Sequence, residues 1–107
     1  MIRHSMHIAD AVLSLIEYLW ETDTFAIDVL PYQNGREHGW AILATSNMVA
    51  FSEDRNSDNI VIYYGKMRDF DPQGYTPDDA TYRNRAFYPL QDIYGAAQYI
   101  VSILRLG

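Results

Sequence analysis

Three short segments with the pattern of β-strands follow one another between His38 and Gly65 and dominate the middle of this chain. They cover residues 39–45, 48–52 and 59–64, and the residues that join them are rich in Ser, Asn and Asp. A period of two places successive side chains on opposite sides of a sheet. The pattern therefore predicts an antiparallel meander, with an apolar face that other parts of the chain must cover.

A further strand is expected before this meander, over residues 24–32, with Pro31 limiting its pairing at the end. The dipeptide Asn34-Gly35 follows it, and both residues tolerate the positive φ of a type I′ turn. A second tight turn is predicted at Ser46-Asn47. These turns give four consecutive antiparallel strands.

Two amphipathic segments flank the strands, at residues 5–20 and 92–104. In each of them apolar residues recur at the i, i+3, i+4, i+7 spacing of one helix face. Ser5 is expected to cap the first helix. Gly95, Ala96 and Ala97 are expected to mark the point where the second helix crosses the first helix or the sheet.

Together these elements predict one α+β domain over residues 1–107, with the order α-β-β-β-β-α. Its four-stranded antiparallel meander carries both terminal helices on one face. A fifth short strand is expected near residues 85–88. A short helix is expected near residues 77–83, with Thr76 as its N-cap and Pro77 in its first position.

The charge and the composition exclude several classes of function. Fourteen acidic and eight basic side chains give a net charge of −6, which argues against direct binding to nucleic acid. The chain has no cysteine, so disulfides and thiol catalysis are excluded, and a reducing compartment fits. No apolar run approaches the roughly 18–20 residues that span a membrane. We therefore expect a cytoplasmic protein that does not enter the membrane.

One loop has part of the pattern of a calcium site. Asp69, Asp71 and Gly74 match the first half of such a loop. Gln73 replaces an acidic ligand, however, and Ala80 stands where the closing glutamate belongs. We predict a solvated acidic loop here, without a metal ion.

The histidines offer two weaker patterns. His4, His7 and Asp10 are spaced so that a continuous helix would place them on one side, but no fourth ligand is indicated. His38 could act as a base with a serine and a nearby acid, yet no strand-turn-helix elbow of the G-x-S-x-G kind is present. A glycine-rich phosphate loop is also absent. We predict no metal, no cofactor and no catalytic residue.

Nine tyrosines are more than one small core needs, because each buried hydroxyl requires a partner. Tyr63 and Leu43 are expected on the sheet face opposite the helices. Tyrosine and methionine are enriched at protein interfaces, so this face could bind a partner. It could equally be covered by the loop of residues 66–89. The sequence leaves both interpretations open.

The favoured function is that of a small acidic, non-catalytic module that binds a protein with a basic surface. The candidate partner-binding residues are Glu53, Asp54, Asp58, Asp69, Asp71, Asp78, Asp79, Tyr63 and Leu43. Size and charge suit an inhibitor carried by a phage or mobile element, such as an anti-CRISPR protein, whose acids imitate nucleic-acid phosphates. Two alternatives are a homodimeric structural or ligand-binding module that pairs through the sheet and a small hydrolase that uses His38 with a nearby acid.

Overall fold

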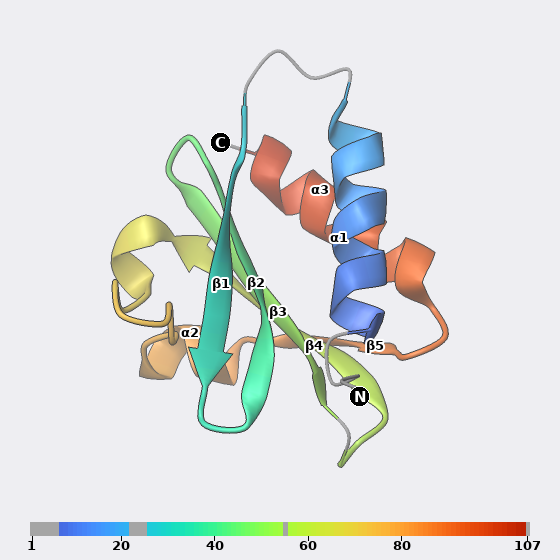
Figure 1. Ribbon diagram of the computed structural model, residues 1–107. Helices are drawn as coiled ribbons and strands as arrows, with labels where there is room; N and C mark the ends of the chain where they lie inside the picture. Colours follow the sequence, from blue (N-terminus) through green and yellow to red (C-terminus); the bar gives the residue numbers. More distant parts are fainter. Residues whose placement is uncertain (1–6, 22–25, 55, 107) are drawn as a thin grey trace.

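A five-stranded antiparallel sheet forms the centre of the computed structural model, which describes residues 7–21, 26–54 and 56–106 (Figure 1). The elements in chain order are α1 (His7–Trp20), β1 (Asp28–Asn34), β2 (Glu37–Ala44), β3 (Asn47–Asp54), β4 (Asn59–Lys66), the 3-10 helix η1 (Met67–Asp69), α2 (Asp79–Arg83), β5 (Ala86–Pro89) and α3 (Ile93–Arg105). The strands lie side by side in chain order. The predicted α+β meander is confirmed, and so is its fifth strand.

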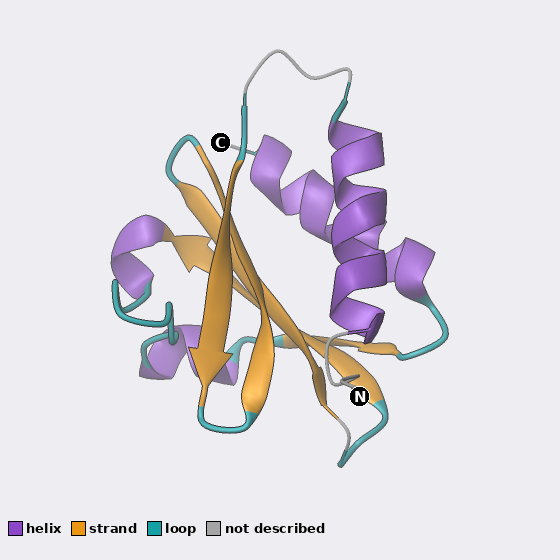
Figure 2. Cartoon of the chain, viewed as in Figure 1, coloured by secondary structure: helices purple, strands orange, loops and turns teal. Residues whose placement is uncertain are grey.

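Helices α1 and α3 pack against each other and cover one face of the sheet (Figure 2). Beneath them Ile42, Phe51, Ile60 and Ile62 are fully buried, and Trp40 is partly buried at the border of this helix-side core. The period of two therefore predicted the correct face for every strand of the meander. The expected N-cap of α1, Ser5, lies outside the described residues.

The small residues of α3 have two different roles. Ala96 and Ala97 are fully buried, as expected for a close helix contact. Gly95 takes part in the N-cap of α3. Asp92 caps the helix by accepting a hydrogen bond from the Gly95 N–H at 3.0 Å, and a Cβ at Gly95 would collide with that carboxylate. Gly95 is therefore suited to the cap.

Both predicted turns occur one residue away from their expected positions. In the first hairpin Asn34 pairs with Glu37, so the central residues are Gly35 and Arg36. Gly35 has φ +62 and Arg36 has no positive φ, which fits a type II′ turn and not a type I′ turn. The hairpin prediction was right, and its turn type was wrong.

The second turn is centred on Thr45 and Ser46 because Asn47 is required elsewhere. The Asn47 side chain is buried, donates a hydrogen bond to the Ile103 carbonyl at 3.2 Å and accepts one from Lys66 Nζ at 2.7 Å. This side chain ties the start of β3 to the ends of α3 and β4. Thr45 consequently takes φ +59, which a β-branched residue rarely adopts.

Strand β1 also differs from its prediction. It begins at Asp28; residues 26 and 27 precede it, and Thr24 lies outside the described residues. Pro31 lies within the strand and not at its end. A proline is tolerated there because β1 is an edge strand and its missing N–H would face away from β2.

Helix α2 starts later than the sequence predicted. Asp78 is its N-cap and accepts a hydrogen bond from the Thr81 N–H at 2.9 Å. Pro77 instead pairs with Phe70 in an isolated antiparallel bridge, and the Asp78 N–H donates to the Asp69 carbonyl at 2.8 Å. This hairpin-like loop takes up the residues that were expected to begin the helix.

The segment of residues 67–83 covers the second face of the sheet (Figure 1). Phe70 from this covering segment packs with Met48, Val61 and Tyr63. These four side chains are buried and form the second core. Leu43 is partly buried at the border of the same cluster. Of the two interpretations that the sequence left open, the covered face is the one observed.

Replacing Ile62 with alanine should lower the free energy of unfolding by about 2–5 kcal/mol, because this side chain is fully buried in the helix-side core. Urea denaturation measures the change. The control Gln98→Ala, on an exposed position of α3, should change stability by less than about 0.5 kcal/mol. A similarly small loss for Ile62→Ala would show that the Ile62 side chain of β4 does not point into the helix-side core.

Candidate functional site

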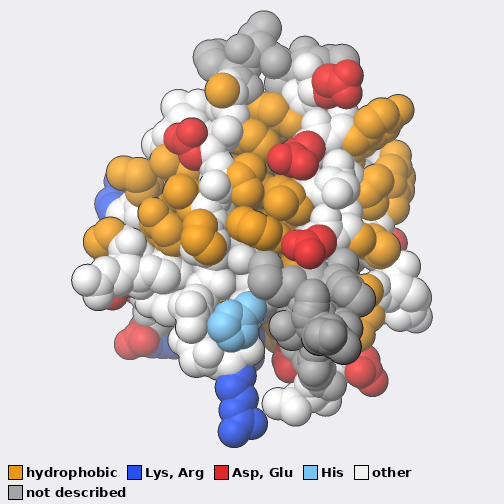
Figure 3. All heavy atoms as spheres, in the orientation of Figure 1, with side chains coloured by type: hydrophobic (Ala, Val, Ile, Leu, Met, Phe, Trp, Pro, Cys, Tyr) orange, Lys and Arg blue, Asp and Glu red, His pale blue; other side chains and the backbone are white. Residues whose placement is uncertain are grey.

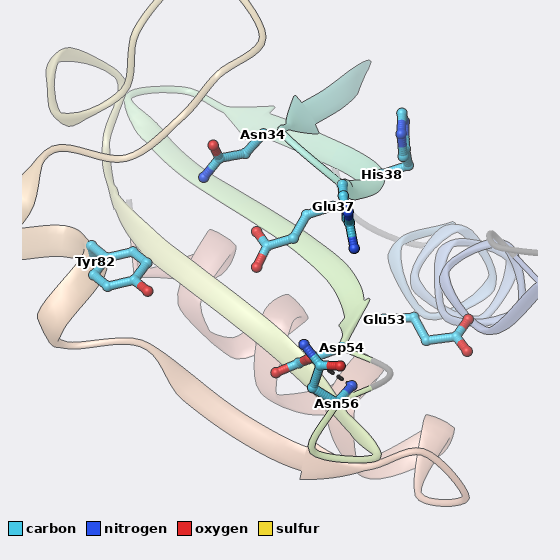
Figure 4. Close-up of a pocket in the computed structure, with 8 residues that line it drawn as sticks. Asn34, Glu37, His38, Glu53, Asp54, Asn56 and Tyr82 are labelled. Atoms are coloured by element: carbon cyan, nitrogen blue, oxygen red, sulfur yellow. Dashed lines mark hydrogen bonds between the residues drawn. The ribbon is translucent and has the colours of Figure 1, made fainter.

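A hollow of about 550 Å³ opens at one end of the sheet, between the β1–β2 turn and the loop after β3 (Figure 4). It exists because β2 and β3 stop pairing at Gly39 and Ser52, while both strands continue. Gly39 makes this last pair possible, since a Cβ there would collide with the Phe51 backbone. The lining residues are Asn34, Arg36, Glu37, His38, Glu53, Asp54, Asn56 and Tyr82.

The lining side chains divide between the two faces of the sheet. Asn34, Glu37 and Tyr82 point toward one another on the side of the second core (Figure 4). His38 and Glu53 point to the other side. The division follows from strand alternation, because neighbouring residues of one strand face opposite ways.

Glu37 is held in place by two buried tyrosines. The Tyr32 hydroxyl donates to its Oε1 at 2.8 Å, and the Tyr63 hydroxyl lies 3.2 and 3.3 Å from its two carboxylate oxygens. Both tyrosines are only 1% exposed. Burial raises the pKa of each phenol well above its usual range, and the neighbouring Glu37 raises it further. Both phenols are therefore neutral hydrogen-bond donors, and they orient the carboxylate.

A row of rings leads from this buried cluster to the surface. Tyr82 stacks on Tyr63 with 5.8 Å between the ring centroids. The Arg85 guanidinium carbon lies 4.3 Å from the centroid of Tyr82 and 5.2 Å from that of Phe87. Tyr82 and Phe87 are 45% and 47% exposed. The row Tyr82–Arg85–Phe87 is thus an exposed aromatic and cationic surface beside the hollow.

The predicted acidic residues fall into two separate places. Glu53 and Asp54 line the hollow, and Asp58 lies in the adjoining loop with φ +56. The other predicted acids lie in the segment that covers the second face: Asp69, Asp71, Asp78 and Asp79. Of these, Asp69, Asp71 and Asp78 line a second, open depression.

Several of these acids also close turns. Asp54 accepts hydrogen bonds from the Asn56 N–H at 3.0 Å and from the Ser57 hydroxyl at 2.8 Å. Asp69 and Asp71 accept backbone hydrogen bonds from Lys66 and Gln73 respectively, each at 2.8 Å. Asparagine keeps an acceptor oxygen at such positions, so it is the replacement that changes charge with the least effect on the fold.

The remaining predicted sites are not assembled in the described residues. Tyr63 is inside the second core and Leu43 lies at its border, so neither is on an open sheet face. His38 points away from Glu37. His4 lies outside the described residues, and among those that are described no three His, Asp or Glu side chains could hold a metal ion together.

Sequence patterns did not identify Glu37, Tyr32, Tyr82 or Arg85 as site residues. Their only signal was the excess of tyrosine, which requires partners for the hydroxyl groups. Glu37 becomes that partner through the β1–β2 register, which places it five residues after Tyr32 and across a turn. Its contact with Tyr63 joins strands that are not neighbours in the sheet, so a local pattern could not reveal it.

Comparison with known proteins finds no matching family model, no similar curated protein and no similar solved structure. None of the described helices has the length and apolar character needed to cross a membrane. The geometry of the hollow and of the row Tyr82–Arg85–Phe87 is therefore the basis for an assignment of function.

Alkaline pH should destabilise the protein through its buried tyrosines. Burial also raises the pKa of Tyr99, to about 12, with a further contribution from Tyr64. Because the folded state raises the pKa values of Tyr32, Tyr63 and Tyr99, the unfolded chain loses these protons first, at about pH 10. The contribution of these three tyrosines to stability should be constant below pH 10, and stability should fall as the pH rises above it.

Urea unfolding measured across this range tests the effect. Tyr63→Phe should reduce the steepness of the alkaline loss, because one group with a raised pKa has been removed. Tyr18→Phe is the matched control, since Tyr18 is 71% exposed. Equal slopes for the wild type and for Tyr63→Phe would contradict the buried, neutral state of Tyr63.

Proposed function

We propose that this chain is a small, non-catalytic protein-binding module that receives a basic segment of its partner at the hollow. Three of the lining residues are acidic, Glu37, Glu53 and Asp54, and one, Arg36, carries a fixed positive charge. The net charge of −6 would steer a basic partner toward the chain.

The observation that carries the proposal is the fixed carboxylate of Glu37. Two buried hydroxyl groups hold it in the lining of the hollow, so little side-chain entropy remains to be lost on binding. A lysine or arginine side chain that enters there would meet this carboxylate beside Tyr82, whose ring already contacts Tyr63 and Arg85. Carboxylates form strong charge-assisted hydrogen bonds with such cations.

The exposed row beside the hollow supports a protein as the partner. Tyrosine, phenylalanine and arginine are the residue types enriched at protein interfaces and at their energetic hot spots. Tyr82, Arg85 and Phe87 form a surface that is ordered by their mutual contacts. A partner that places a cation in the hollow could pack apolar groups on this row.

Within this proposal, the partner is a cytoplasmic protein with a basic groove, such as one that binds nucleic acid. The chain would then act as an inhibitor of the kind that phages and mobile elements carry against host defences, including anti-CRISPR proteins. Its carboxylates would occupy positions that phosphates take in the natural ligand.

The two alternatives have less support. A hydrolase based on His38 would need a nucleophile beside it; Glu53 points to the same side as His38 (Figure 4), but Ser52 is fully buried and, as the neighbour of Glu53 in β3, faces the other side of the sheet. A dimer that pairs through the second sheet face would need that face open, and the segment of residues 67–83 covers it. A protein-binding role is the function that uses the features observed at the surface.

Quantitative partner capture from a native lysate tests the proposal. The double variant Glu37→Gln/Asp54→Asn should lose the captured protein, because it removes two charges from the hollow while keeping acceptor oxygens. Raised salt should weaken capture by the wild type.

The control Glu17→Gln/Glu21→Gln removes as many charges as the hollow variant and should retain the partner. Glu17 lies in α1, Glu21 directly follows this helix, and both are exposed. A third variant, Asp71→Asn/Asp79→Asn, shows whether the acids of the covering segment contribute. Equal retention by the wild type and the hollow variant would exclude the hollow as the binding site.

A further inference from the structure

The outer edge of β1 is only partly closed. Backbone N–H groups alternate in direction along a strand. Residues whose N–H faces β2 therefore alternate with residues whose N–H faces outward. The Gln33 N–H faces outward, because it donates to the Gly74 carbonyl of the covering segment at 3.1 Å. Pro31 and Val29 therefore face outward as well, and Pro31 has no N–H to offer.

The free part of this edge is short and well defined. Ile27 packs in the same core as Val29, so the alternation continues to Ile27. Along the described chain, no hydrogen bond reaches the outward groups of residues 27, 29 and 31. They comprise the N–H groups of Ile27 and Val29 and the carbonyls of all three residues.

We propose that this edge pairs with the same edge of a second copy of the chain, antiparallel, about a two-fold axis at Val29. In that register the two Val29 residues exchange a reciprocal pair of hydrogen bonds. Each Ile27 N–H donates to the Pro31 carbonyl of the other copy. The missing N–H of Pro31 leaves only the Ile27 carbonyl without a donor in each copy.

The neighbouring symmetric registers are less favourable. An axis at Pro31 would have no N–H at its centre. An axis at Gln33 is blocked, because the Gly74 segment already occupies that position. An axis at Leu30 would set Val29 opposite Pro31, which has no N–H, and Ile27 opposite the occupied Gln33. An axis at Asp28 would set the two Asp28 carboxylates directly opposite each other, which is destabilising. The register about Val29 is thus the favoured one.

The side chains around the axis also favour a second copy. Hydrophobic side chains gather along β1 and in the space between β1 and α1 (Figure 3). Val29 and Ile27 are partly buried at this border of the helix-side core. Pairing would place Val29 against Val29 of the second copy and Ile27 against Pro31 of the second copy, and it would extend the sheet across both.

Salt separates this contact from the partner binding proposed above. Each copy carries a net charge of −6, and Asp28, which is exposed, would approach Asp28 of the other copy diagonally across the axis. Screening therefore strengthens the self-association, whereas it weakens an acid–base contact. The inference does not depend on the hollow.

Sedimentation of the purified protein over a concentration series, at low and high salt, tests the pairing. We expect a monomer–dimer equilibrium that shifts toward the dimer at high salt. Val29→Pro removes the outward N–H and should weaken the dimer at least about tenfold. Val29→Thr keeps the N–H and a similar shape, and it should still form the dimer. Circular dichroism and urea unfolding confirm that each variant is folded.

Pro31→Ala provides a second, opposite test. It adds an outward N–H that can reach the Ile27 carbonyl of the other copy, so it should strengthen the dimer. This variant decides the question even if Val29→Pro impairs folding. A wild type and a Pro31→Ala variant that both stay monomeric would overturn the proposal. A dimer that responds to neither variant would also overturn it.

Discussion

A sheet with two apolar faces must be covered on both sides, and in this protein the second cover is the segment of residues 67–83. The two terminal helices account for one face only. The segment is fixed at two points: the Met67 N–H donates to the carbonyl of Ser46 in the β2–β3 turn at 3.0 Å, and the Gly74 carbonyl accepts from Gln33 in the edge strand β1. Between these points Phe70 fills the second core. Gly74 suits its place because it has φ +79 and a Cβ would press on the Gln33 carbonyl.

The covering segment determines both the contacts of Glu37 and the position of the exposed row Tyr82–Arg85–Phe87. The covering segment buries Tyr63, whose hydroxyl then needs an acceptor, and Glu37 in the lining of the hollow supplies one. It places Tyr82 on Tyr63, which starts the exposed aromatic row. By occupying Gln33 it also limits the free edge of β1 to the residues around Val29. One packing requirement therefore determines the hydrogen-bond partners of Glu37, the exposed row Tyr82–Arg85–Phe87 and the extent of the free edge of β1.

The sequence predicted the parts of the fold that depend on local periodicity. The alternation in 39–64 placed Ile42 and Ile62 toward the helices and Tyr63 away from them, as observed. Predictions were wrong where a distant group decides the local structure. The second turn shifted because Asn47 bonds to α3, and α2 began later because Pro77 pairs with Phe70. The hollow could not be predicted, since it arises where two strands stop pairing.

The segment of residues 67–83 is an integral layer of the fold, and native-state hydrogen exchange tests this most directly. The amides of Gln33, Met67 and Asp78 hydrogen-bond within or to that segment. They should exchange with free energies close to those of central sheet amides such as Ile62, because the second core must open to release them. Rapid exchange of these three amides while the sheet stays protected would contradict the account. It would mean that the second face is covered only loosely.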